Sequence, residues 1–426
     1  MKYSKLITAL MLSATMAGTA IAQNAPVEIY GNLNVAGVAH KGPGLDAFNM
    51  HSSVLGNSVL GFRSKHDVGS GFTTRINLET AVNANNGNVG SSLSGVGGTN
   101  PGTGYIASSG SSTMFYRKAN VELGVNSAGT FTIGRQLTPH FAQSAQISAL
   151  GIASGGINQA IAFGASFGAT GNKLLSGTTS PLNPDLNVST TIGGPNNYAN
   201  GIGWKSPTVS GLTVNALWAM GQNGPTASNS FDQQGQKNIV VDYKNGPFFA
   251  LVGRQLLNDN VGNELMTSNM ASLGYTAGKL TTKLGYYDAK FGRCSETKSG
   301  GNCMTSAMGI SAAGVISPAV NAASGTRYGA DFKATEIGTS YQINDRSRVA
   351  AAYTLVNDEI TAANKVKFTS VYGEYDLSKN TRLFALASRA DNSGLASASP
   401  IFGMPAKTST NGQAVDAVAL GMRVLF

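Results

Sequence analysis

The feature that most constrains this chain is a series of short segments in which apolar and polar residues alternate. In the last of them, Val418, Leu420, Met422, Val424 and the terminal Phe426 alternate with residues that are small or polar except at the end of the chain. A two-residue period indicates a β-strand with one apolar face. Sixteen such segments are expected, at 27–38, 58–67, 72–82, 113–125, 129–136, 198–207, 211–220, 236–245, 246–256, 267–277, 278–288, 330–343, 345–356, 366–377, 380–390 and 414–426. Most are close to the roughly nine to eleven residues with which a tilted strand crosses a bilayer.

Short and long connections alternate between these segments, with seven short and eight long. Asn245-Gly246 is a typical short turn, whereas the longest connection is the third long loop, 137–197. An even-stranded membrane barrel has all short turns on one rim and all long loops on the other. A soluble β-sandwich gives no reason for this regularity. The pattern predicts an all-β fold, a transmembrane antiparallel β-barrel of sixteen strands with short periplasmic turns and long extracellular loops.

Composition agrees with strands that meet lipid on one face and water on the other. Charged residues make up only 12% of the chain, which holds 54 glycines, and this suits short strands joined by polar loops. Beyond the first residues, no stretch approaches the ~18 to 20 apolar residues of a spanning helix. Basic residues neither form runs nor interleave with aromatic residues, so the positive net charge does not indicate a nucleic-acid partner.

The first residues have the pattern of a secretory signal peptide. Lys2 and Lys5 provide a positive start, an apolar stretch follows, and 20–22 offers small residues for cleavage. The apolar stretch is too short for a bilayer helix, although a retained anchor is the alternative. We therefore expect a signal peptide at 1–22 and a single barrel domain at 23–426.

The two cysteines and four histidines give little indication of a metal site. Cys294 and Cys303 lie close together in a segment rich in Gly, Ser and Lys, and an oxidising exterior favours a local disulfide. A metal pair is the alternative, but no further ligand lies nearby in the sequence. No histidine has metal-ligand spacing, and no strand–helix nucleophile elbow is recognisable. We expect no cofactor, no metal and no enzymatic activity.

Three parts of the sequence resemble the general trimeric porins of Gram-negative outer membranes, most of all their β-proteobacterial and neisserial branch. These parts are the strand–turn segment 58–71, the segment 129–136 that ends in Gly-Arg-Gln, and the terminal Phe426. Two departures are Val59, where an arginine is common, and the stretch 137–141, which lacks the usual acid. The resemblance implies an outer-membrane homotrimer, a third loop folded into the lumen, and Phe426 as a C-terminal assembly signal.

Charged side chains on the inward side of the expected strands are the candidate pore-lining residues. They are Arg63, Lys65, Arg75, Glu79, Lys118 and Glu122, with Arg135 at the loop junction and Asp185 in the third loop. Arg117 falls on the lipid side of the alternation but near the outer rim, where either face is open to it. A basic wall facing a nearly neutral loop favours anions. The alternative is that the arginines only pair with glutamates and hold the wall rigid.

These observations predict a water-filled channel for passive diffusion of small hydrophilic solutes and ions, with a mild preference for anions. Two alternatives stay open: a substrate-specific channel, and a surface adhesin or receptor built on a barrel. The apolar sequence of the third loop favours packing against the wall over a mobile exposed lid. Lipopolysaccharide is an expected partner, and loop residues such as Lys173, Lys298 and Arg327 are candidates to contact it. The alternative is that these loop charges are only solvated.

Overall fold

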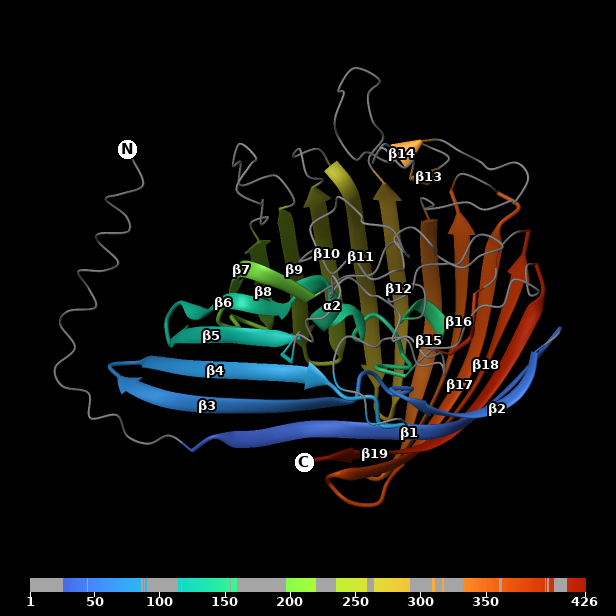
Figure 1. The fold of residues 1–426 in the computed structure, drawn as a ribbon, viewed down its shortest axis with the longest axis horizontal. Coiled ribbons are helices and arrows are strands. Elements are labelled where there is room, and N and C mark those ends of the chain that lie inside the picture. Colours follow the sequence, from blue (N-terminus) through green and yellow to red (C-terminus); the bar gives the residue numbers. More distant parts are fainter. Residues whose placement is uncertain are drawn as a thin grey trace.

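The computed structural model shows strands that stand side by side and curve into a barrel around the helix α2, Pro139–Ser144 (Figure 1). It describes 26–89, 114–158, 197–219, 235–258, 264–291, 309–310, 316–317, 332–401 and 412–426, apart from a few single positions. The signal-peptide prediction for 1–22 therefore lies outside the described residues. None of the helices in these ranges is long and apolar enough to span a membrane.

The strands follow the predicted order closely. The first nine are β1 Glu28–Gly42, β2 Leu45–Ser52, β3 Val59–Gly69, β4 Phe72–Ala81, β5 Lys118–Val125, β6 Gly129–Leu137, β7 Asn197–Lys205, β8 Leu212–Ala219 and β9 Gln236–Asn245. The others are β10 Phe248–Asn258, β11 Glu264–Ala277, β12 Leu280–Phe291, β15 Phe332–Asn344, β16 Ser347–Asp358, β17 Lys365–Asp376, β18 Thr381–Ser393 and β19 Ala414–Leu425. The short pair β13 Gly309–Ile310 and β14 Ile316–Ser317 forms a separate ladder.

Antiparallel pairing of neighbouring strands closes the sheet into a ring. β1 pairs with β19 on one side, and with both β2 and β3 on the other. Because β2 and β3 meet successive parts of β1, they are two halves of one wall strand, and the seventeen-stranded sheet is a barrel of sixteen. Closure pairs β1 with β19, the two strands that would otherwise be the edges of an open sheet in lipid. The prediction of a sixteen-stranded antiparallel barrel is confirmed.

The first long loop was predicted too long. Instead of an irregular segment at 39–57, β1 continues to Gly42 and β2 pairs back along it, with Val35 opposite Ser52. Phe48 and Met50 expose 70% and 53% of their surfaces, as lipid-facing side chains do. The strand pauses only between Ser53 and Ser58, where Ser53 has a positive φ. A second boundary also differs, since β5 begins at Lys118 rather than at 113.

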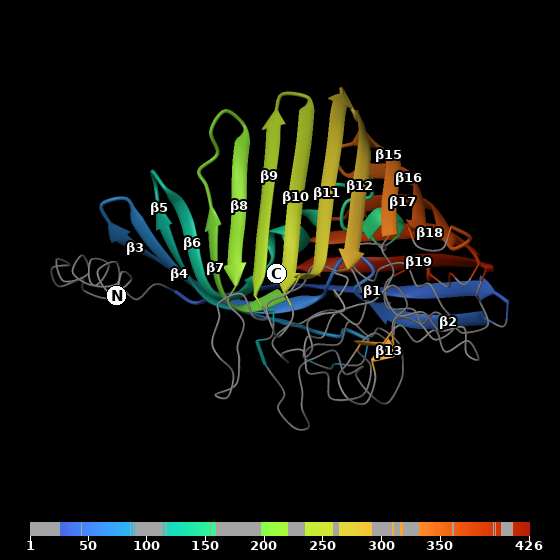
Figure 2. The same ribbon diagram turned by 90° about the horizontal axis from the view of Figure 1, so that it is seen from above.

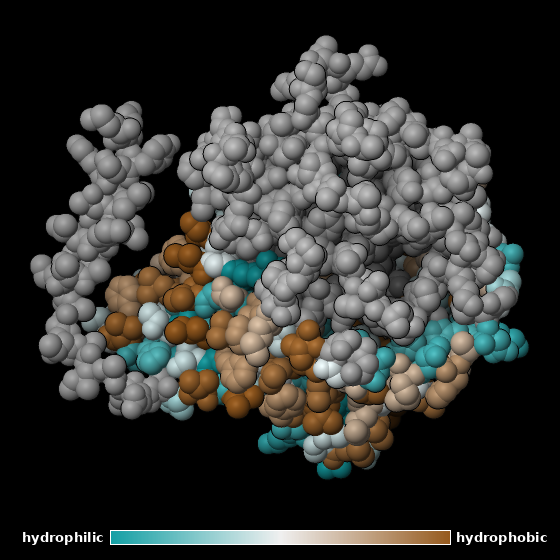
Figure 3. Space-filling view, viewed as in Figure 1, coloured by the Kyte–Doolittle hydropathy of each residue, from teal (hydrophilic) through white to brown (hydrophobic). Residues whose placement is uncertain are grey.

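Alternation along the strands separates a lipid face from a lumen face. Ile76, Val121 and Ile133 are 46%, 52% and 64% exposed, whereas Asn77 and Asn120, one position away, are buried. Figure 3 shows hydrophobic side chains gathered over β3 to β6. Figure 2 shows the short turns, such as that between β9 and β10, at one edge of the wall. The outer wall is thus apolar and the inner wall is polar, as a membrane barrel requires.

Candidate functional site

Two ion pairs lie on the inner wall formed by β1, β3, β4 and β5. The guanidinium of Arg63 donates from Nε to Glu28 Oε2 at 2.6 Å and from Nη2 to Glu28 Oε1 at 2.5 Å. Arg75 Nη1 donates to Glu122 Oε2 at 3.2 Å. Lys65 lies directly opposite Arg75 in the strand register, so two cations face each other there. These pairs remain partly exposed to the lumen.

Glu79 is the centre of a more buried cluster nearer the long-loop rim. Its carboxylate accepts from Tyr30 Oη at 2.9 Å, Arg117 Nε at 2.8 Å and Lys118 Nζ at 2.9 Å. Arg117 is 7% exposed, and its side chain turns to Glu79 although its position alternates with lumen-facing Lys118. Strand parity alone did not assign Arg117 to a face, because a long side chain at the end of a strand bends toward an available carboxylate.

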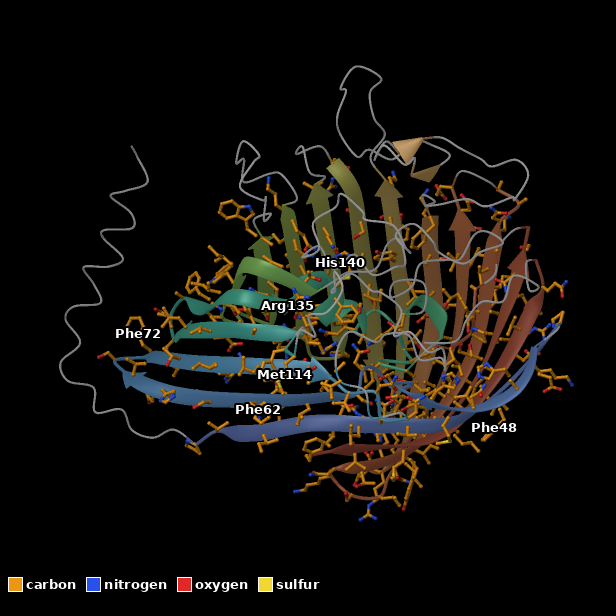
Figure 4. The ribbon with its side chains drawn as sticks, viewed as in Figure 1. Phe48, Phe62, Phe72, Met114, Arg135 and His140 are labelled. Atoms are coloured by element: carbon orange, nitrogen blue, oxygen red, sulfur yellow. The ribbon has the colours of Figure 1, made fainter. Side chains whose placement is uncertain are left out.

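Arg135 lies where β6 ends and the third loop begins, close to α2 (Figure 4). The register sets it opposite Ala119 and two positions after the lipid-facing Ile133, so regular alternation would turn Arg135 to the lipid side and not to the lumen as predicted. The ladder to β7 shifts directly after Gly134, whose φ is 114°. Its position therefore differs from the simple inward alternation of Arg63 and Arg75.

The third loop enters the lumen through α2. Thr138 caps this helix by accepting from Phe141 N–H, and Pro139 opens it. His140 is fully buried against the wall: its N–H donates to Asn238 Oδ1 at 3.0 Å, and its ring stacks edge-on against Tyr287. Figure 4 shows His140 on α2, inside the barrel. Burial without a carboxylate partner lowers the pKa of His140 to about 3.

The loop beyond α2 is held by charged side chains of the opposite wall. Lys283 Nζ donates to the carbonyl oxygens of Gln146 and Ser148 at 2.8 and 3.2 Å. Glu336, which is 3% exposed, accepts from Ile157 N–H at 2.8 Å and from Thr354 Oγ1 at 2.7 Å. For the described part, 137–158, the predicted folding of the third loop into the lumen is confirmed and the exposed lid is excluded.

Small residues let the loop lie close to the wall. A Cβ at Gly285 would come within 2.8 Å of the Ile147 carbonyl oxygen, and one at Gly338 within 2.8 Å of Ala149 Cβ. Apolar packing completes the contact, because Ile147 and Ile157 are fully buried in a cluster with Tyr287 and Phe332. The loop thus narrows one side of the lumen as a packed element.

Three arginines of the inner wall were missed by the sequence analysis. Arg348 and Arg382 both bind Glu374, at 3.0 and 2.9 Å, and Arg348 also donates to Ala149 O of the third loop. Arg423 lies opposite Arg382 in the register of β18 and β19. The same alternation that selected Arg75 identifies them, since each falls on the inward side of a correctly predicted strand.

The remaining predicted residues divide between closure and segments that the structure does not describe. Phe426 N–H donates to Gly31 O at 3.1 Å and its carbonyl accepts from Gly31 N–H at 2.8 Å, so Phe426 joins the two ends of the barrel. The other predicted residues lie outside the described residues: Asp185, Cys294, Cys303, Lys173, Lys298 and Arg327.

Comparison with known proteins identifies the lineage of this barrel. The family described as Gram-negative porin matches residues 7–395. This chain belongs to the Gram-negative porins. Curated proteins gave no match.

Solved porin structures share the fold at low sequence identity. An anion-selective porin from Comamonas acidovorans aligns with a TM-score of 0.63 and 17% identity, covering 95% of this chain and 100% of its own. OmpF of Salmonella typhi, solved with daunomycin, aligns with a TM-score of 0.55 and 11% identity, covering 94% and 98%. OmpT of Vibrio cholerae aligns with a TM-score of 0.52 and 14% identity, covering 94% and 97%.

Membership of this family confirms the central functional prediction. The protein is an outer-membrane porin, and its barrel is a channel for passive diffusion of small hydrophilic solutes. A sixteen-stranded barrel is wide enough to keep an aqueous channel. The described part of the third loop lies against the inner wall from β8 to β16, through α2 and through its contacts with Lys283, Glu336 and Arg348. Arg75 and Glu122, on β4 and β5, bind each other and stay partly exposed.

Proposed function

We propose that this porin prefers anions mildly. The observation that carries the proposal is the charge of the inner wall near the short turns. The cations there are Arg63, Lys65, Arg75, Lys205, Lys244, Lys283, Arg348, Arg382 and Arg423, and the carboxylates are Glu28, Asp67, Glu122, Asp242, Glu374 and Asp376. An excess of fixed cations raises the local concentration of anions and lowers that of cations.

The roles of single residues follow from their contacts. Arg75, Lys65 and Arg63 face the open side of the lumen and set the field, with Glu122 and Glu28 as partners that reduce it. Glu79 and Lys118 hold the rim of β4 and β5 together with Arg117. Arg135 positions the start of the third loop. We assign Asp185 to the constriction and a disulfide to Cys294 and Cys303 on the sequence argument alone.

Reversal potentials across planar bilayers with a KCl gradient test the preference. Chloride permeability above potassium permeability is expected, and the ratio should fall toward one at high salt because screening shortens the reach of wall charges. A cation preference at low salt would contradict the proposal.

We also propose a homotrimer and a processed N-terminus. The family resemblance implies three subunits, and the exposed apolar surface over β3 to β6 offers area for contact. Light scattering of the detergent-extracted protein, corrected for bound detergent, gives the number of subunits. Edman sequencing of the exported protein should begin at Gln23, and a start at Met1 would contradict the signal peptide.

A further inference from the structure

A groove of about 610 Å³ lies along the lipid-facing side of β7 to β10, away from the lumen. Neighbouring strands contribute to it in register, since Ile202 pairs with Trp218, Trp218 with Lys237, and Ile239 with Arg254. Ile202, Trp218 and Ile239 are 41%, 42% and 47% exposed, as outer-wall residues are. β8, β9 and β10 stand side by side in Figure 2. The groove is thus an apolar depression in the lipid-facing wall, with the two cations Lys237 and Arg254 at its border.

Arg254 is the unusual member of this surface. It is exposed between Ile239 and Asn269 on the lipid side, and in the described part of the chain it makes no ion pair. Two other outer-wall cations have acidic partners, since Lys333 binds Glu359 and Arg389 binds Asp391 and Asp416. The exposed Lys365 and Lys367 instead lie at the long-loop end of β17. A cation facing lipid is unfavourable unless an anion meets it. The described residues supply that anion for Lys333 and Arg389 but not for Arg254, where an anion from outside can take the place.

The height of Arg254 in the wall fits a lipid headgroup. Phe248 and Tyr275 form an exposed aromatic pair at the short-turn end of β10 and β11. Arg254 is six residues further along, about 15 to 20 Å nearer the long-loop end. Long basic side chains extend toward the interface, and Lys237 lies one further step in that direction, opposite Leu256. The indole of Trp218 beside them is typical of a membrane interface.

We propose that this groove binds a phosphate-bearing lipid of the leaflet on the long-loop side. An acyl chain fills the apolar part between Ile202 and Ile239, and the phosphate lies against Arg254, with Lys237 above it. Guanidinium and phosphate form paired hydrogen bonds, which makes arginine the suited residue. The site is separate from the lumen, so its occupant does not compete with permeating solutes.

The tryptophans provide a direct measurement, because the chain has two and both Trp204 and Trp218 line the groove. The purified porin in neutral detergent micelles is titrated with dibrominated phosphatidic acid or dibrominated phosphatidylcholine, whose bromines quench tryptophan at contact. Half-quenching is expected at about fivefold less phosphatidic acid, the factor that one arginine near an anionic lipid contributes.

Variants separate this site from general charge attraction. Arg254→Gln should bring the two lipids to equal quenching, whereas Arg254→Lys should keep most of the preference. Arg389→Gln, on the outer face of β18, is the matched control and should keep the full preference. Circular dichroism and unchanged single-channel conductance verify that each variant is folded.

Three results would overturn the proposal. Equal quenching of the wild-type protein by both lipids shows that phosphate is not recognised. Loss of the preference in Arg389→Gln as well shows attraction by total charge. Loss of the preference in excess inorganic phosphate shows that the site takes the free ion rather than the lipid. None of these results bears on the anion preference of the pore, which conductance measures independently.

Discussion

The two sides of the lumen use the same kinds of charged residue for different purposes. On β3 to β5, Arg75 and Glu122 remain partly exposed, with nothing but each other and neighbouring wall groups to bind. On β12 to β16, Lys283 and Glu336 are turned to the backbone of the third loop. We infer that charged side chains hydrogen-bonded to the third loop hold it in position, whereas charged side chains that face the water of the lumen act on permeating ions.

The largest effect that this comparison predicts is at the loop side. Glu336→Ala leaves Ile157 N–H and Thr354 Oγ1 without their acceptor. Unsatisfied buried groups cost about 1 to 3 kcal/mol each, so the third loop should detach from the inner wall for part of the time. Single-channel recordings should show strongly increased open-channel noise and substates. Glu122→Gln is the control, since its partner Arg75 does not touch the loop; equal noise in both variants would remove the distinction.

Low pH should weaken the contact between the third loop and the inner wall through protonation of His140. Its pKa in the folded protein is about 3 against an ordinary 6.5, so the unfolded or undocked state binds the proton more readily. The loop contact is therefore fully present above pH 6.5 and weakens by about 1.4 kcal/mol per unit as pH falls toward 3. Channel noise should rise below about pH 5. His140→Gln does not titrate, so its noise should change little with pH; an unchanged acid response would assign it to other groups.

On the open side, Arg75→Glu should change selectivity rather than noise. The substitution reverses one charge next to Glu122, a net change of two units. An interaction of about 1 kcal/mol corresponds to about a fivefold shift of the anion-to-cation permeability ratio. Reversal potentials in a KCl gradient measure it. Arg389→Glu on the outer wall is the matched control and should leave the ratio unchanged. If Arg75→Glu increased channel noise and left the permeability ratio unchanged, Arg75 would hold the third loop and would not set selectivity.

The smallest expected effect is at Lys65. Its side chain is exposed and faces Arg75 in the register. Lys65→Gln removes one screened charge, so the permeability ratio should move toward cations by less than about twofold. Thermal unfolding should be unchanged, or slightly delayed because two like charges no longer face each other. A lower unfolding temperature would show that Lys65 holds the wall.

Much of the fold was predictable because the barrel repeats one simple rule. Alternation located β9 and β10 to within two residues of their ends, and loop lengths gave the direction of each strand. The hairpin partner β2 was missed because the whole segment 39–57 was predicted as one loop. Phe48 and Met50 carry the alternation there, and a strand followed by a pause at Ser53 is still a strand.

The site was less predictable because side-chain partners come from distant strands. Alternation gives a face, and so it found Arg75 and Glu122. It does not show that Arg117 bends to Glu79, or that Glu336 accepts from a loop residue 179 positions earlier. Arg348, Arg382 and Arg423 were within reach of the same rule, had it been applied to the last strands as it was to the first.

The seam between β1 and β19 makes the ring depend on its most distant parts. Gly31 and Phe426 exchange two backbone hydrogen bonds across almost the whole length of the chain. Bringing such remote segments together costs more chain entropy than any hairpin, and contacts of this kind slow folding. We therefore expect the hairpins to form early and the β1–β19 pairing late, so that folding passes through an open sheet with two unpaired edge strands.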